Sequence, residues 1–133
     1  MPMEVVVRFF RSGKTNTDSQ RATKPGHVAP HEALQLLEQG AVMIDVRESH
    51  EWEAGRVAGA RHLPLTNLSS HMNEIPKGRK IVVACRSGGR SAHAAKILHK
   101  AGHDVVNLRG GLHAWHLAGL PLVSKRGKPG RLR

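Results

Sequence analysis

The stretch KIVVACRSGGRS, residues 80–91, joins a strand-like apolar run to a glycine turn and the start of a helix. Residues 80–84 are almost entirely apolar, which is typical of a strand buried on both faces of a parallel sheet. Cys85 follows directly, and apolar residues recur at helical spacing over residues 90–101, before a stop at Gly102. The stretch therefore predicts a strand–turn–helix unit with a thiol at the turn.

Strand-like and helix-like segments alternate on both sides of this stretch. The apolar pattern predicts further strands over residues 41–46, 60–65 and 104–108, and further helices over residues 30–39, 48–53, 67–74 and 113–118. Such alternation predicts an α/β fold, an open parallel sheet flanked by helices on both faces. A chain of 133 residues that is 39% apolar suffices for a single domain.

The net charge of +11 is concentrated at the two ends of the chain. Residues 1–26 carry five basic and two acidic side chains, and we interpret them as an N-terminal extension and linker, with a strand-like run over residues 5–10. Residues 27–123 form the expected domain, with eleven basic and eight acidic side chains. Residues 124–133 carry five basic and no acidic side chains, and their composition predicts a basic C-terminal tail that does not fold.

Cys85 is the single cysteine, which excludes an internal disulfide, a CxxC redox pair and a cysteine-rich zinc finger. A lone thiol fits a reducing compartment, and the sequence has no apolar run of membrane-spanning length, so we expect a cytoplasmic protein without a membrane partner. The ten histidines include the pairs His99/His103 and His113/His116. These lack cysteine or carboxylate partners at suitable spacing, so no metal site is expected.

The predicted turn favours a reactive thiolate at Cys85. Unpaired backbone N–H groups at a helix start, the helix dipole and two nearby arginines all favour thiolate over thiol. Gly88 and Gly89 allow the backbone to curl, so that several N–H groups can point at one anionic centre. The sequence therefore predicts a nucleophilic thiolate in an anion-binding cradle.

Four segments in register resemble the rhodanese sulfurtransferase family over roughly residues 27–123. They are the active-site loop CRSGGRS at 85–91, the stretch IDVRE with Glu51-Trp52 at 44–52, the segment GRVAGARHLP at 55–64, and the signature NLRGGLHAW at 107–115. The resemblance implies a rhodanese-like single-domain fold. It also implies a sulfurtransferase that moves a sulfane sulfur from a donor such as thiosulfate to cyanide or a thiol, through a persulfide on Cys85.

The resemblance assigns roles to the residues of the loop. Cys85 is the nucleophile and sulfur carrier, and the substrate- and persulfide-binding loop consists of Arg86, Ser87, Gly88, Gly89, Arg90 and Ser91. Asp45 and Arg47 are supporting residues, with a carboxylate expected to pair with a loop arginine. We expect Gly110 and Gly111 to serve a turn, and Trp52 and Trp115 to pack in the core.

The resemblance implies no cofactor beyond the covalent persulfide. Since there is no second cysteine, discharge of that persulfide requires an external acceptor. The expected partners are a small sulfur donor and, as acceptor, a small thiol, cyanide, a dithiol protein or a sulfur-carrier protein; the sequence leaves these open. Binding of nucleic acid by the basic ends is not expected, because aromatic residues make up 3% of the chain.

Two other functions remain as alternatives. Glu51 aligns where two-domain thiosulfate enzymes of the family carry a substrate-binding arginine, which favours a rhodanese-like sulfur-carrier or regulatory binding module with little thiosulfate activity. Phosphatases that resemble this fold have a C-x5-R loop, which is wide enough for phosphate or arsenate. The spacing from Cys85 to Arg90 is C-x4-R, so phosphatase or arsenate reductase activity is less favoured.

Overall fold

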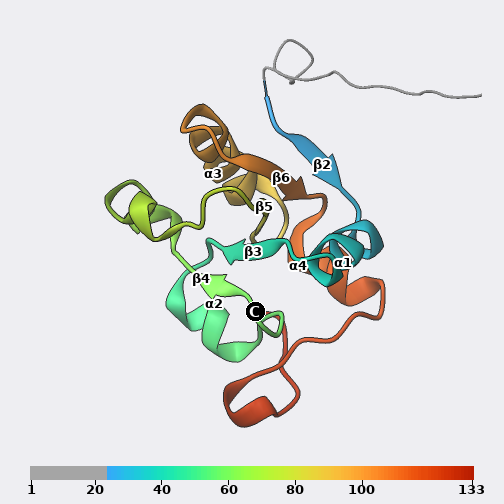
Figure 1. Cartoon of the computed structure of the whole chain (residues 1–133). Coiled ribbons are helices and arrows are strands. Elements are labelled where there is room, and N and C mark those ends of the chain that lie inside the picture. Colours follow the sequence, from blue (N-terminus) through green and yellow to red (C-terminus); the bar gives the residue numbers. More distant parts are fainter. Residues whose placement is uncertain (1–23) are drawn as a thin grey trace, which may run out of the picture.

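The computed structural model describes residues 24–133 (Figure 1). Most of the N-terminal extension, including the strand-like run over residues 5–10, lies outside the described residues. Five parallel strands form one sheet in the order β2-β6-β5-β3-β4. Their bounds are Gly26–Val28 (β2), Val42–Asp45 (β3), Arg61–His62 (β4), Lys80–Ala84 (β5) and Asp104–Leu108 (β6). The fold class expected from the sequence is therefore confirmed.

Helices cover both faces of the sheet. Four α-helices span Pro30–Glu38 (α1), Ser49–Ala54 (α2), Gly89–Lys100 (α3) and Gly111–Leu117 (α4). Side chains from α3 and residues 63–75 share one buried cluster with the sheet, whereas α1 and α4 share the other. The sheet thus lies between two apolar layers, with α2 beside the β4 edge (Figure 1).

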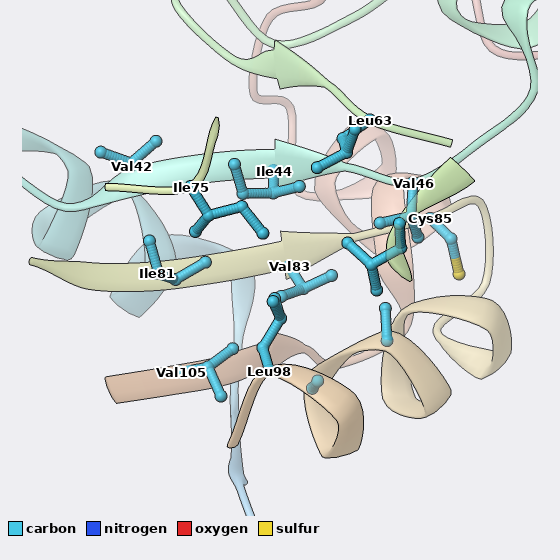
Figure 2. Packing of buried hydrophobic residues seen from close by; sticks show 13 residues of the cluster. Val42, Ile44, Val46, Leu63, Ile75, Ile81, Val83, Cys85, Leu98 and Val105 are labelled. Carbon is cyan, nitrogen blue, oxygen red and sulfur yellow. The ribbon is translucent and has the colours of Figure 1, made fainter. Parts of the chain in front are cut away.

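Alternation along β5 positions the cysteine. Ile81 and Val83 pack into the cluster on the α3 face, whereas Val82 and Ala84 pack into the cluster on the α1/α4 face. Since successive side chains of a strand point to opposite faces, Cys85 turns toward the α3 face. Figure 2 shows this cluster, with the sulfur of Cys85 beyond the end of its strand.

Several elements differ from the sequence-based expectation. β2 pairs with β6 and begins at Gly26, inside the segment interpreted as a linker. The strand expected over 60–65 is reduced to the two residues of β4. The helix expected over 67–74 is replaced by 3-10 turns at Leu65–Asn67 and Ser69–Glu74. β2 and β4 are the two edge strands of the sheet, where a strand has one neighbour instead of two.

The basic C-terminal segment packs against the domain instead of remaining unfolded. Val123 exchanges two backbone hydrogen bonds with Arg56, at 2.9 and 2.8 Å, and the N–H of Arg131 donates to the carbonyl oxygen of Ala54 at 2.9 Å. Leu132 packs against the cluster on the α1/α4 face. We call residues 122–133 the C-terminal strap. Composition could not predict this packing, because the strap is held by backbone hydrogen bonds and by the burial of one leucine side chain.

Gly130 is where the strap can be tested. A Cβ on this residue would lie 2.6 Å from the carbonyl oxygen of Val123 and 2.8 Å from the Cα of Gly55, both in the backbone. We expect Gly130→Ala to loosen the strap and to accelerate hydrogen exchange at the Arg131 amide by at least about tenfold, or about 1.4 kcal/mol of local stability. Gly26→Ala, which meets no atom within 4 Å, is the matched control. Unchanged exchange at Arg131 would contradict the packing.

Candidate active site

Cys85 is the centre of the site and is 1% exposed. Two donors meet its sulfur: the backbone N–H of Gly88 at 3.1 Å and the hydroxyl of Ser91 at 3.3 Å. Both come from the turn and first helical residues that follow β5. Both groups donate to the sulfur, so they are placed to stabilise negative charge that develops there.

Gly88 supplies the turn that aims its N–H at the sulfur. It adopts a positive φ of 108° and caps the N-terminus of α3, a conformation that side chains other than glycine rarely adopt. Its carbonyl oxygen accepts from the N–H of Ala92 at 3.0 Å. One residue thus joins the sulfur to the helix.

The N-terminus of α4 binds the backbone of the cysteine loop through two hydrogen bonds. The N–H of Leu112 donates to the carbonyl of Cys85 at 2.8 Å, and the N–H of His113 donates to the carbonyl of Arg86 at 2.9 Å. In trans peptides the N–H points opposite to the C=O, so the N–H groups of Arg86 and Ser87 point away from α4. That side of the loop is where the N–H cradle predicted from the sequence would lie.

Gly110 and Gly111 make this grip possible. Gly110 has a φ of 74° at the N-cap of α4, and Gly111 has a φ of 64°. A Cβ on Gly111 would lie 2.4 Å from the carbonyl oxygen of Arg86 and 2.6 Å from that of Cys85. Their expected role in a turn is confirmed, and the turn also supports the cysteine loop.

Glu51 and Arg90 form a two-point ion pair beside the loop, with N···O distances of 2.6 and 2.8 Å. The bond from Arg90 is the main cause that lowers the pKa of Glu51 to about 2, against desolvation, which raises it. The same bond raises the pKa of Arg90, with smaller contributions from the charges of Glu51 and Cys85. The charge of Arg90 is therefore largely neutralised by Glu51.

Asp45 pairs with Arg47, not with an arginine of the cysteine loop as expected. Both residues are fully buried, with the Nε of Arg47 2.9 Å and its Nη2 2.8 Å from the carboxylate oxygens. The same Nη2 donates to the carbonyl of Gly55 at 2.7 Å. The pair thus ties the end of β3 to the end of α2, the helix that carries Glu51, so its support of the site is indirect.

The other loop residues form the exposed part of the site. Arg86, Ser87 and Gly89 are exposed. The Nε of Arg86 donates to the main-chain oxygen of Arg133 at 3.0 Å, so the strap reaches the cysteine loop.

Sequence reasoning missed two residues that position the loop. The first is Glu51 as the partner of Arg90. The second is Asn107 on β6, which is 3% exposed and whose Nδ2 lies 3.3 Å from the carbonyl oxygen of Gly88 and 3.2 Å from the Nδ1 of His27. Its Oδ1 is buried without a partner among residues 24–133. Asn107 could have been noticed as a polar residue between apolar ones near the end of β6, because a buried side-chain amide requires hydrogen-bond partners.

The two tryptophans have different environments. Trp115 is 1% exposed and donates to the carbonyl of Pro121 at 3.0 Å, which confirms core packing. Trp52 is half-buried, stacks on His62 with ring centroids 4.7 Å apart, and has the guanidinium of Arg56 at 4.8 Å from its ring. The expectation that Trp52 packs in the core is therefore wrong.

Residues 24–133 contain neither a cluster of metal ligands nor a membrane-spanning helix. No group of three or more potential metal ligands comes together there. No helix in that part of the chain is long and apolar enough to cross a membrane.

A loop-borne cysteine at the carboxyl end of a central parallel strand, cradled by two helix starts, defines a class of single-domain α/β proteins with a reactive thiol. The profile of the rhodanese-like domain matches residues 29–118, and the chain belongs to that family.

Named relatives agree with this assignment. The chain is 40% identical to a sulfurtransferase of Allochromatium vinosum over 67% of its own length and 84% of the relative. It is 35% identical to the thiosulfate sulfurtransferase GlpE of Pseudomonas fluorescens, covering 66% and 82% of the two chains. A solved rhodanese-related protein of Thermoplasma volcanium matches with a TM-score of 0.70 and 26% identity, over 74% of this chain and 97% of that one. Two further relatives, from Synechocystis and Bacillus subtilis, are matched over 58% and 60% of their own length.

The Glu51–Arg90 pair predicts an acid-dependent stability. A carboxyl whose pKa is lowered in the folded state stabilises the fold above its unfolded pKa, and this contribution is lost as pH falls toward the folded pKa. We therefore expect Glu51→Gln to lower the free energy of unfolding near neutral pH and to flatten its decline between about pH 4.5 and about 2. Denaturant titrations at several pH values measure this. Glu38→Gln, an exposed control on α1, should keep the wild-type slope; equal slopes for all three proteins would contradict the pairing.

Proposed function

We propose that this protein is a sulfurtransferase that carries a sulfane sulfur on Cys85 from a donor such as thiosulfate to a thiophilic acceptor, cyanide or a thiol. The main observation behind the proposal is that the sulfur of Cys85 lies at the end of a central strand with hydrogen-bond donors at 3.1 and 3.3 Å. Membership of the rhodanese-like family and relatives named sulfurtransferases support it.

The first half-reaction loads the cysteine. The Cys85 thiolate attacks the outer sulfur of thiosulfate, a new S–S bond forms, and the old S–S bond breaks with its electron pair leaving on sulfite. The anionic charge then lies on the outer sulfur of the persulfide, where the N–H groups of Arg86 and Ser87 are suited to stabilise it. A covalent intermediate of this kind divides one difficult transfer into two easier steps.

The second half-reaction unloads it. A nucleophile such as cyanide attacks the outer sulfur, the persulfide S–S bond breaks, and its electron pair returns to Cys85 as a thiolate. Because Cys85 is the chain's single cysteine, a nucleophile from outside this chain must accept the sulfur. No cofactor takes part in either step, and a reducing compartment such as the cytoplasm suits the free thiolate.

A second candidate is a sulfur-carrier or regulatory binding module with little thiosulfate activity. The ion pair of Arg90 with Glu51 favours it, because a neutralised arginine attracts an anionic donor weakly. The same pair argues against a phosphatase, which needs its loop arginine free for the phosphate.

Loading is tested by intact mass. Incubation with thiosulfate should add one sulfur atom to the wild type, and cyanide should then remove it. Cys85→Ser, which preserves size and removes the nucleophile, should gain nothing. A gain in the variant would refute Cys85 as the carrier, whereas no gain in the wild type would refute thiosulfate as a donor and favour the carrier or binding module.

The local charge is tested by alkylation of Cys85 with anionic iodoacetate and neutral iodoacetamide. Arg90→Ala leaves the Glu51 carboxylate unpaired beside the thiol, so we expect the ratio of the two rates to fall several-fold. Glu51→Gln frees the charge of Arg90, so the ratio should rise. Since both variants break the same ion pair, a parallel change in the two would indicate a damaged loop and would contradict the electrostatic role.

A further inference from the structure

The strap carries five basic side chains, and its last residue reaches the cysteine loop. Its backbone is bound to Ala54 and Arg56, and the main-chain oxygen of Arg133 accepts from the side chain of Arg86, the residue next to Cys85. The exposed cations of this surface, which we call the basic collar, are Arg86, Lys125, Arg126, Lys128, Arg131 and Arg133.

The side chains of the collar differ from the other arginines around the site in having no Asp or Glu partner in the described part of the chain. Arg47 and Arg90 are each matched by a carboxylate, Asp45 and Glu51. Within residues 24–133, no collar side chain forms an ion pair with an Asp or Glu side chain, and the Nε of Arg86 donates to the main-chain oxygen of Arg133. The collar therefore adds positive charge that no Asp or Glu side chain in that range neutralises.

A hollow adds shape to this surface. It measures about 450 Å³ and lies between α2 and the strap, lined by Glu53, Ser124, Lys125, Arg126 and Lys128. Three cations face one carboxylate there, so the hollow still suits an acidic side chain. Arg126 holds a positive φ of 62°, a conformation that non-glycine residues keep only where the surrounding structure imposes it.

We propose that the basic collar is a docking surface for an acidic protein segment whose thiol accepts the sulfur from Cys85. This inference rests on the proposed function and names the class of acceptor for it. Complementary charge speeds association and orients the partner, and both serve a transfer in which a thiolate must reach one sulfur atom.

A nucleic acid fits this surface less well. Binding of single strands uses exposed aromatic faces, but Trp115 is buried and Trp52 is covered by His62 and Arg56. Nucleic acid also lacks the thiol that the transfer requires.

The test uses two synthetic peptides, each with one cysteine, one flanked by aspartates and glutamates and the other by asparagines and glutamines. The chain is loaded with thiosulfate, checked by intact mass and freed of excess donor, and persulfide discharge to each peptide is timed. We expect the acidic peptide to react at least about tenfold faster at low salt, and this preference to shrink as screening increases. Equal rates for both peptides in the wild type would overturn the proposal.

Charge-reversal variants locate the effect. The triple change Lys128→Glu, Arg131→Glu and Arg133→Glu should abolish or invert the preference. The matched control reverses the charge of three exposed lysines near the amino-terminal ends of the strands, opposite the cysteine loop: Lys24→Glu, Lys77→Glu and Lys100→Glu. This control should keep the preference for the acidic peptide. An equal loss in both triple variants would show that net charge, and not the collar, is responsible.

Binding measured on Cys85→Ser separates this proposal from the proposed function, because it needs no persulfide. The acidic peptide should bind this variant more tightly than the neutral one, and the collar reversal should remove the difference. Failure of sulfur loading with retained binding would overturn thiosulfate as the donor and leave the docking surface standing. Stronger collar-dependent binding of polyuridylate than of the acidic peptide would overturn the protein partner in favour of nucleic acid.

Discussion

The grip of α4 on the cysteine loop is the constraint on which the site depends. Two N–H groups at the start of α4 hold the carbonyls of Cys85 and Arg86, and Gly111 permits this approach because a side chain would collide with both. With the carbonyls fixed on one side, the planar peptides present their N–H groups on the other. Gly88 completes the loop by turning its own N–H onto the sulfur. The orientation of the loop's N–H groups is thus set by backbone geometry and depends little on which side chains the loop carries.

Pairing of charges separates the parts of the site that hold shape from the parts that meet a substrate. Asp45 and Arg47 are buried together, where either charge alone would be costly, and they tie β3 to the end of α2. Glu51, on that helix, then reaches Arg90 on α3. A chain of contacts therefore runs from a buried ion pair to the helix that follows the cysteine. Because Arg90 is paired with Glu51, it offers little uncompensated positive charge to a substrate. Under the proposed function, attraction of an anionic substrate then depends on Arg86 and the strap.

The sequence predicted what local pattern determines. The mostly apolar runs at 80–84 and 104–108 predicted two strands with the bounds that the structure has, because a strand buried on both faces carries few polar residues. Cys85, its glycines and its arginines were found because they are contiguous in the chain. The partners of Arg90 and Arg86 were not found, since Glu51 and Arg133 are 39 and 47 residues away and only the tertiary fold brings them near. The packing of the strap was not predicted for a related reason. Its basic composition describes its side chains, whereas its hydrogen bonds to the domain are made by the backbone.

The position of the strap bears on how a single-cysteine sulfurtransferase selects its acceptor. A persulfide that cannot be discharged within its own chain waits for a second molecule, and any thiol that reaches it takes the sulfur. The sulfur of Cys85 is almost fully buried, so the surface around the loop decides which thiols arrive. In this chain that surface carries unpaired positive charge on a segment packed in place by backbone hydrogen bonds. Selection by charge at the rim leaves the transfer chemistry at the sulfur unchanged, so a common catalytic loop can serve different acceptors by varying what is folded beside it.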